Sequence, residues 1–195
     1  MLPTRRTHHL HPGRWSSEQA RYFVTICTAQ RQPGLTHPAL APILHQAWDA
    51  LAENGDVAIL CRTIMPDHLH LLFRLGPRLS VGQVVGKFKT GVWSAMQARG
   101  LAWQRDFYEH RLRPEDAQEG VGWYIFLNPY RKSLAGLDES WPWWRLDEPT
   151  AFVFPSQLRP GGCPPPEWLG QVAAWRAGQR WLRQPKPPAG RRAKL

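Results

Sequence analysis

Residues 57–75 read Val-Ala-Ile-Leu-Cys-Arg-Thr-Ile-Met-Pro-Asp-His-Leu-His-Leu-Leu-Phe-Arg-Leu, and this stretch decides the fold. Two runs within it, at about 57–64 and at 68–75, are rich in the β-branched, aromatic and other apolar residues that are typical of strands. The Met-Pro-Asp between them, at 65–67, is typical of a turn. The stretch therefore predicts two antiparallel strands joined by a tight hairpin.

The second of these strands carries His68 and His70, two residues apart. Successive side chains of a strand point to opposite faces, so both imidazoles project from one face while Leu69, Leu71 and Phe73 point into the core. Two imidazoles close together on one face are a natural pair of metal ligands. The chain has eight histidines, so the pair alone fits two solvated surface residues equally well.

The segments around the hairpin predict further strands and helices. Aromatic and β-branched residues predict a strand at 22–28, and a similar run predicts another at 107–112. Apolar residues at helical spacing predict helices at 38–53 and 80–96, the latter with Ser80 as its N-cap.

A last helix is predicted from the Pro-Glu-Asp at 114–116 to Asn128, because Pro129 cannot easily continue it. The order β-α-β-β-α-β-α places a hairpin between helices. We therefore expect an α+β domain with a ferredoxin-like antiparallel sheet and the helices packed on one face.

Tyr124 and Asn128 stand four residues apart on this last helix and therefore share one of its faces. If that face covers the strand with the two histidines, Asn128 could give an oxygen to the same ion, and Tyr124 a phenol beside a bound phosphate. A divalent cation would assist a hydroxyl whose ordinary pKa of about 10 makes it a poor nucleophile. Taken singly, Tyr124 is more typical of a core aromatic, and Asn128 of a helix end.

These motifs occur together and in order, and they carry a resemblance. After the strand at 22–28 come Met-Pro-Asp-His-Leu-His-Leu-Leu at 65–72, Trp-Gln-Arg-Asp-Phe-Tyr-Glu-His at 103–110 and Tyr-Ile-Phe-Leu-Asn-Pro at 124–129. Over roughly residues 14–145 the chain resembles the REP-associated tyrosine transposases. These are relatives of the insertion-sequence transposases that have one catalytic tyrosine and an HUH motif.

The resemblance implies a ferredoxin-like fold and a role for each motif. It makes His68 and His70 the HUH ligands of Mg²⁺ or Mn²⁺, and Asn128 the third ligand. It makes Tyr124 the nucleophile, which leaves a 5′-phosphotyrosine and a free 3′-hydroxyl on single-stranded DNA. The implied target is a DNA hairpin with a short single-stranded guide beside it. Asp67 stands where such sequences often have asparagine, a change that we expect to be mild.

The charge is uneven along the chain, whose 195 residues carry 25 Lys and Arg against 15 Asp and Glu, a net +10. A protein this basic usually binds a polyanion. Residues 1–20 hold a net +2, and residues 155–195 hold eight basic residues against Glu167. We therefore divide the chain into a basic N-terminal arm at 1–20, a catalytic domain at 21–154 and a basic, Pro- and Arg-rich C-terminal tail at 155–195. Apolar residues near helical spacing at 167–182 predict a short helix in that tail.

Cations that follow phosphates and rings that stack on bases suit single-stranded DNA. The candidate contacts inside the domain lie on the second helix and around the fourth strand, and they are Lys87, Lys89, Arg105, His110, Arg111 and Arg113. For the two lysines the alternative is a solvated helix face, and for His110 it is a structural role.

We predict a metal-dependent, tyrosine-mediated enzyme that cuts and joins single-stranded DNA at hairpin sites. The alternatives are a hairpin-binding regulator that does not cut, and a metal-dependent hydrolase without a covalent step. Three widely spaced cysteines, no secretory pattern and no run of 18 apolar residues favour a cytoplasmic, nucleoid-associated protein without a membrane partner. Monomer and homodimer both stay open.

Overall fold

The computed structural model describes residues 20–113 and 116–179. In these residues one antiparallel sheet has the strand order β4-β1-β3-β2-β5. Its strands are β1 (Arg21–Cys27), β2 (Val57–Ile64), β3 (His68–Leu75), β4 (Tyr108–Arg111) and β5 (Trp144–Leu146). The α-helices of the same residues are α1 (Ala41–Glu53), α2 (Val81–Gly91), α3 (Trp93–Gln97), α4 (Gln118–Arg131) and α5 (Trp168–Gly178). Short 3₁₀ helices lie at Ala29–Arg31, Pro149–Ala151, Phe154–Gln157 and Pro160–Gly162.

The predicted hairpin is confirmed, since β2 and β3 pair antiparallel around the turn at 65–67. β3 is the central strand of the sheet and pairs with β1 on its other side. The register places Thr25 of β1 and Thr63 of β2 opposite His70. Because neighbouring strands occupy both edges of β3, its side chains can pack only against the elements above and below the sheet.

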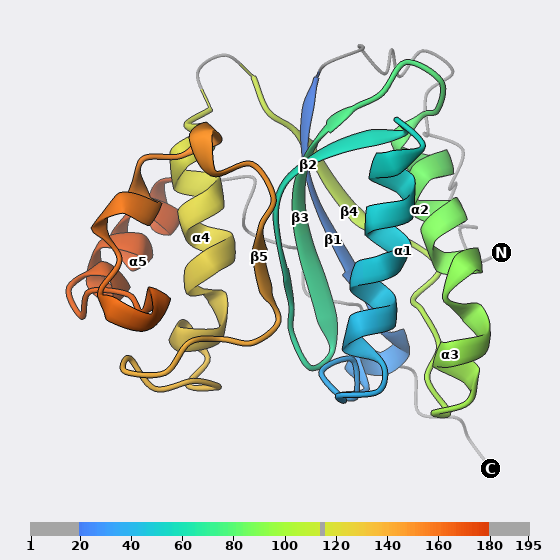
Figure 1. The fold of residues 1–195 in the computed structure, drawn as a ribbon, viewed down its shortest axis with the longest axis horizontal. Helices are drawn as coiled ribbons and strands as arrows, with labels where there is room; N and C mark the ends of the chain where they lie inside the picture. Colours follow the sequence, from blue (N-terminus) through green and yellow to red (C-terminus); the bar gives the residue numbers. More distant parts are fainter. Residues whose placement is uncertain (1–19, 114–115, 180–195) are drawn as a thin grey trace, which may run out of the picture.

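One face of the sheet packs on α1 and α2 (Figure 1). Leu69, Leu71 and Phe73 of β3 are buried in this core, as the alternation predicts. Ser80 is the N-cap of α2 and forms a capping box with Gln83, which confirms the predicted cap. The helix predicted at 80–96 is divided in two, because the regular α2 ends at Gly91, a residue of low helix propensity.

The other face of the sheet packs on α4, so the expectation of helices on one face only is wrong (Figure 1). The reason lies in α4 itself, of whose 14 residues ten are buried. A helix that is apolar on most of its circumference needs neighbours on more than one side. The sheet covers one side of α4, and α5 packs on another.

The end of α4 also differs from the prediction, because the helix continues through Pro129 to Arg131. Proline removes one backbone hydrogen bond from a helix. Here Pro129 and Tyr130 are buried, and Lys132 N–H donates to the carbonyls of Asn128 and Pro129, so the last turn stays closed. α4 therefore presents one more turn of side chains than the sequence predicts.

Within the described residues, no helix combines the length and apolar character needed to cross a membrane.

Candidate active site

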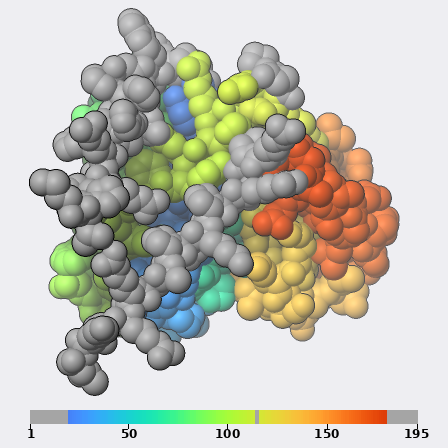
Figure 2. Space-filling view, turned by 180° about the vertical axis from the view of Figure 1, so that it is seen from behind, coloured from blue at the N-terminus to red at the C-terminus, as the bar shows by residue number. Residues whose placement is uncertain are grey.

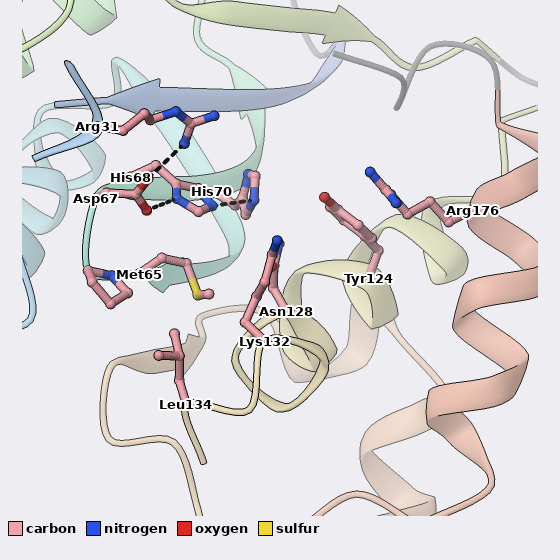
Figure 3. A pocket seen from close by; sticks show the side chains of 11 residues that line it. Arg31, Met65, Asp67, His68, His70, Tyr124, Asn128, Lys132, Leu134 and Arg176 are labelled. Atoms are coloured by element: carbon pink, nitrogen blue, oxygen red, sulfur yellow. Dashed lines mark hydrogen bonds and ion pairs between the residues drawn. The ribbon is translucent and has the colours of Figure 1, made fainter. Parts of the chain in front are cut away.

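A cavity of about 660 Å³ opens where β3 faces α4 (Figure 3). It brings together all four residues that the sequence analysis selected for chemistry: His68, His70, Tyr124 and Asn128. The charged residues that line the same cavity are Arg31, Asp67, Lys132 and Arg176.

The two histidines converge on each other through their Nε2 atoms, which lie 3.1 Å apart. Each Nδ1 has its own partner. His68 Nδ1 lies 2.6 Å from Asp67 Oδ1, and His70 Nδ1 lies 2.7 Å from Thr25 Oγ1. A metal-binding histidine usually has such a partner on its other nitrogen, which fixes the orientation of the ring. Asp67 and Thr25 thus hold both Nε2 atoms toward one point.

Arg31 extends this chain of contacts, because its guanidinium donates to Asp67 Oδ2 at 3.3 Å. Gln30 and Arg31 both have positive φ, 54° and 58°, in the left-handed region that such residues rarely adopt. This tight turn after β1 brings Arg31 to Asp67. The sequence analysis missed both Thr25 and Arg31. Strand pairing would have indicated Thr25, whereas no sequence pattern marks Arg31.

Both imidazoles favour the neutral form that binds cations. Burial lowers the pKa of His70 well below its ordinary value, and the charges of His68 and Arg31 act in the same direction. Burial also lowers the pKa of His68, although the hydrogen bond and charge of Asp67 oppose it. For Asp67, burial raises the pKa, but the contacts with His68 and Arg31 outweigh it and keep the carboxylate ionised.

Tyr124 and Asn128 lie one turn apart on α4, and both line the cavity. Tyr124 is 7% exposed, its ring centroid lies 5.6 Å from that of His70, and its hydroxyl points toward His70 (Figure 3). The Arg131 guanidinium lies 5.4 Å from the centre of the Tyr124 ring. Lys132 lines the cavity a further turn along the helix. The four-residue spacing therefore places all three side chains on the face of α4 that borders the cavity.

The residues present fit a divalent cation. Two neutral imidazoles with converging Nε2 atoms, each held from behind, are a prepared pair of ligands. In the described part of the chain, no group of three or more His, Cys, Asp or Glu side chains could hold a metal. Asn128, 3% exposed, lines the same cavity and carries an amide oxygen that could serve as a third ligand. A mixed nitrogen and oxygen set suits Mn²⁺ and, through the oxygen, Mg²⁺.

The cations selected from the sequence as DNA contacts lie elsewhere. Lys87 Nζ is 2.6 Å from Asp56 Oδ2, and Lys89 Nζ donates to the carbonyl of Gln104 at 2.7 Å. Both belong to α2, on the opposite face of the sheet from α4. Both lysines therefore hold loops to the core in this structure.

The remaining candidates gather around β4, the outer strand next to β1. Arg105 is exposed in the loop before it. His110 Nε2 is 3.0 Å from Asp116 Oδ2, and His110, Arg111 and Arg113 line a separate depression of about 450 Å³. The described residues that line the main cavity include none of these four. Any DNA contact at β4 would be a second surface.

The cavity has its own cations, which the sequence analysis missed: Arg31, Lys132 and Arg176. Lys132 follows Asn128 at the same four-residue spacing that links Tyr124 to Asn128. That spacing would have identified it, had the helix not been predicted to end at Pro129.

The fold and the site together define a class: an antiparallel sheet whose central strand presents two histidines to a helix that bears a tyrosine. Residues 16–112 match the model of the "Transposase IS200 like" family, and the chain belongs to this family. Membership of a transposase family implies an enzyme that processes DNA. The predicted relationship to the insertion-sequence transposases is thereby confirmed, and the REP-associated group within them stays a prediction.

Two particular proteins are similar to this chain. An uncharacterised protein of Haemophilus influenzae is 26% identical over 142 residues, which are 55% of this chain and 79% of that protein. The structure of a REP-associated tyrosine transposase bound to a REP hairpin aligns with a TM-score of 0.57 at 20% identity, over 74% of this chain and 82% of that one. The family match contains both histidines but ends before α4. Tyr124 and Asn128 are therefore supported by their place in the structure alone.

Proposed function

We propose that this protein is a single-strand DNA endonuclease and strand transferase that acts at hairpin-associated sites through Tyr124. One observation carries the proposal: the Tyr124 hydroxyl points toward a pair of imidazoles that converge on each other and are each held by a partner (Figure 3). This arrangement places a nucleophile beside a cation site in one cavity, which is what phosphoryl transfer to a side chain requires.

In the cutting step the Tyr124 oxygen attacks a phosphorus of the DNA backbone. The bond from that phosphorus to the 3′-oxygen breaks, the phenol proton leaves Tyr124, and the departing 3′-oxygen takes up a proton. The products are a 5′-phosphotyrosine and a free 3′-hydroxyl. The joining step is the reverse, with a 3′-hydroxyl attacking the phosphotyrosine. One phosphodiester is exchanged for another, so the cycle needs no co-reactant.

The residues of the site divide this work. His68, His70 and Asn128 would hold Mg²⁺ or Mn²⁺, which when bound polarises the phosphate and stabilises its developing charge. Thr25 and Asp67 keep the imidazoles oriented. On the other side of the nucleophile, the Arg131 guanidinium lies 5.4 Å from the centre of the Tyr124 ring and adds a positive charge next to the site of attack.

Hairpin DNA is the proposed substrate. The REP-associated relative was solved bound to a REP hairpin, and this chain carries a net charge of +10. Among the described residues, the cavity is lined by the cations Arg31, Lys132 and Arg176 and by one carboxylate, that of Asp67. Such a positive cavity favours phosphate groups.

A covalent-adduct assay tests the proposal. The full chain is incubated with a labelled DNA hairpin that has a single-stranded flank, in Mn²⁺ or with a chelator, and adducts are separated under denaturing conditions. We expect an adduct that needs the metal, disappears in Tyr124→Phe and persists in Tyr130→Phe, a matched tyrosine on the same helix. No adduct from the intact protein, or an undiminished adduct in Tyr124→Phe, would overturn the proposal.

The same assay separates the two alternatives. A regulator that does not cut would bind the hairpin without cleaving it, and His68→Ala would change little. A hydrolase without a covalent step would still cleave DNA in Tyr124→Phe but would lose activity in His70→Ala.

A further inference from the structure

The helix α5 and the segment before it pack on α4 at two positions that only glycine allows. The Trp175 ring lies against Gly120, and a Cβ at Gly120 would overlap that ring. Phe152 lies against Gly122 in the same way. Glycine inside a helix costs about 1 kcal/mol of stability relative to alanine. At both positions this loss allows an aromatic ring to pack directly on the helix backbone. Figure 2 shows the C-terminal part of the chain lying directly against the segment that follows α4.

This packing brings Arg176 into the wall of the active-site cavity. The Trp175 ring lies 6.4 Å from the Tyr124 ring, and the next residue, Arg176, lines the cavity with Tyr124 and Lys132. Figure 3 shows Arg176 reaching from α5 to the side of Tyr124 that faces away from His70. Residues 155–179 thus contribute a charged group to a site whose other members belong to residues 21–154.

The cations around Tyr124 are not held by carboxylates, unlike many other basic side chains of the described residues. Ion pairs with carboxylates hold many basic side chains of the described residues, among them Arg62, Arg74, Arg78, Lys87, Arg145 and Arg159. In the same part of the chain, Arg131, Lys132 and Arg176 form no ion pair with a carboxylate.

Arg131 and Arg176 both lie beside Tyr124, since Arg131 contacts its ring and Arg176 lines the cavity with it. Burial lowers the pKa of Arg131, the contact with Tyr124 opposes this effect, and the charge of Arg176 adds to it. Like charges held together in a partly buried place are destabilising, and an anion between them would relieve the repulsion. The ligand that fits this cluster is therefore an anion, and in a transposase the available anion is a phosphate of the DNA backbone.

We propose that α5 supplies Arg176 to the active site as a phosphate-binding residue, and that Arg176, Arg131 and Lys132 hold the DNA phosphate next to the one that Tyr124 attacks. The attacked phosphate must lie between the Tyr124 hydroxyl and the histidines. Arg176 lies on the opposite side of Tyr124, so its phosphate is a neighbouring one. The inference rests on the proposed function and deepens it by giving the cavity a second subsite.

DNA binding in the Tyr124→Phe background tests the inference without covalent trapping. Arg176→Gln should weaken binding of the flanked hairpin by about tenfold, the loss of one charge-assisted hydrogen bond. The slope of log affinity against log salt should fall by about 0.7, the value for one phosphate contact on a single strand. Arg176→Lys should restore most of both quantities. Arg99→Gln removes the same charge from an exposed arginine after α3 and should change neither.

A second variant moves the helix and keeps the charge. Trp175→Ala removes the ring that rests on Gly120, so it should weaken DNA binding as Arg176→Gln does, while circular dichroism shows an intact sheet. Lysine rescue at 176 should fail in this background, because the helix that carries the charge is no longer fixed.

The outcomes separate the two proposals. If the intact protein forms no covalent adduct, the proposed function fails, whatever Arg176→Gln does to binding. If the adduct forms and Arg176→Gln matches Arg99→Gln in affinity and salt slope, the inference about α5 is wrong. Tighter binding or faster adduct formation in Arg176→Gln would also overturn it, because α5 would then obstruct the site.

Discussion

The two faces of β3 show how one strand serves two purposes. Toward α1 and α2 the strand contributes Leu69, Leu71 and Phe73, all at most 2% exposed, to an apolar core. Toward α4 it contributes His68 and His70, whose Nδ1 atoms both have partners. Because successive side chains alternate, fixing the leucines in a tightly packed core also fixes the histidines. Packing of the apolar face therefore fixes the position of the strand, and with it the positions of the two histidines.

The buried histidines of the two faces differ in their hydrogen bonding. On the α4 face, all four ring nitrogens of His68 and His70 lie within 3.1 Å of another polar atom. On the α1 face, His45 is 2% exposed and neither of its ring nitrogens has a hydrogen-bond partner within the described structure. Buried polar groups without partners are costly, and the two histidines that face α4 avoid this cost, whereas His45 does not.

The largest contrast is expected between two adjacent residues of β3. His70→Ala should reduce adduct formation more than about 100-fold, more than the loss of a group behind a ligand costs, because it removes the ligand itself. Leu71→Ala should lower the free energy of unfolding by about 2–5 kcal/mol, since it leaves a cavity in the core. Adduct assays and urea unfolding on both variants measure the two effects. If Leu71→Ala reduced adduct formation per folded molecule as much as His70→Ala does, the division of β3 into a stability face and an activity face would be wrong.

A sharper contrast lies between the two threonines that flank His70 in the sheet. Thr25 Oγ1 lies 2.7 Å from His70 Nδ1, whereas the buried Thr63 hydroxyl has no hydrogen-bond partner among the described residues. Thr25→Val should raise the Mn²⁺ concentration needed for half-maximal adduct formation about 10- to 100-fold. Thr63→Val has the same change of shape and should leave that concentration unchanged. Equal effects would mean that orientation of His70 does not depend on Thr25.

The same partner effect is expected for His68. Asp67→Ala should raise the Mn²⁺ requirement within the same range, about 10- to 100-fold, because His68 Nδ1 loses its acceptor. Asp67→Asn keeps an oxygen at that position and should cost less. An Asp67→Asn variant as impaired as Asp67→Ala would show that the charge matters rather than the hydrogen bond.

Local patterns predicted the central part of the molecule well. The alternation in residues 57–75 gave both hairpin strands and the shared face of His68 and His70, since that information lies within a few residues. Ser80 was predicted as an N-cap for the same reason. β5 was not predicted, because three residues cannot form a pattern and pairing with β2 decides their conformation.

The rest of the site depends on tertiary contacts. Lys87 and Lys89 were predicted as DNA contacts, and an isolated charge pattern could not reveal that they contact Asp56 and the Gln104 carbonyl in the folded chain. Lys132 was missed because Pro129 was expected to end the helix, whereas burial keeps the last turn closed. Which face of the sheet α4 covers could not be inferred, since its apolar residues surround the helix.

Acid should destabilise the α1 face through His45. Burial, with the charges of Arg62 and Arg145, lowers the pKa of His45 to about 3. A group with a depressed pKa contributes its stability above the unfolded value of about 6.5 and loses it as the pH falls toward the folded value. Stability should therefore fall by about 1.4 kcal/mol per pH unit from about pH 6 to pH 4 on this account. Urea unfolding of His45→Leu over this range should show a correspondingly smaller fall, and an identical pH profile would contradict the assignment.

The smallest expected effect compares one lysine from each side of the sheet. Lys132 lines the cavity, whereas Lys87, which lies on α2, is bound by Asp56. In the Tyr124→Phe background, Lys132→Gln should weaken hairpin binding a few-fold and reduce the salt slope by about 0.7, since one phosphate contact is lost. Lys87→Gln makes the same change of charge and should leave the slope unchanged, because a lysine already paired with a carboxylate has no counterion to release. If Lys87→Gln reduced the slope as much, the DNA would have to follow α2, and the cavity beside α4 would not be its main path.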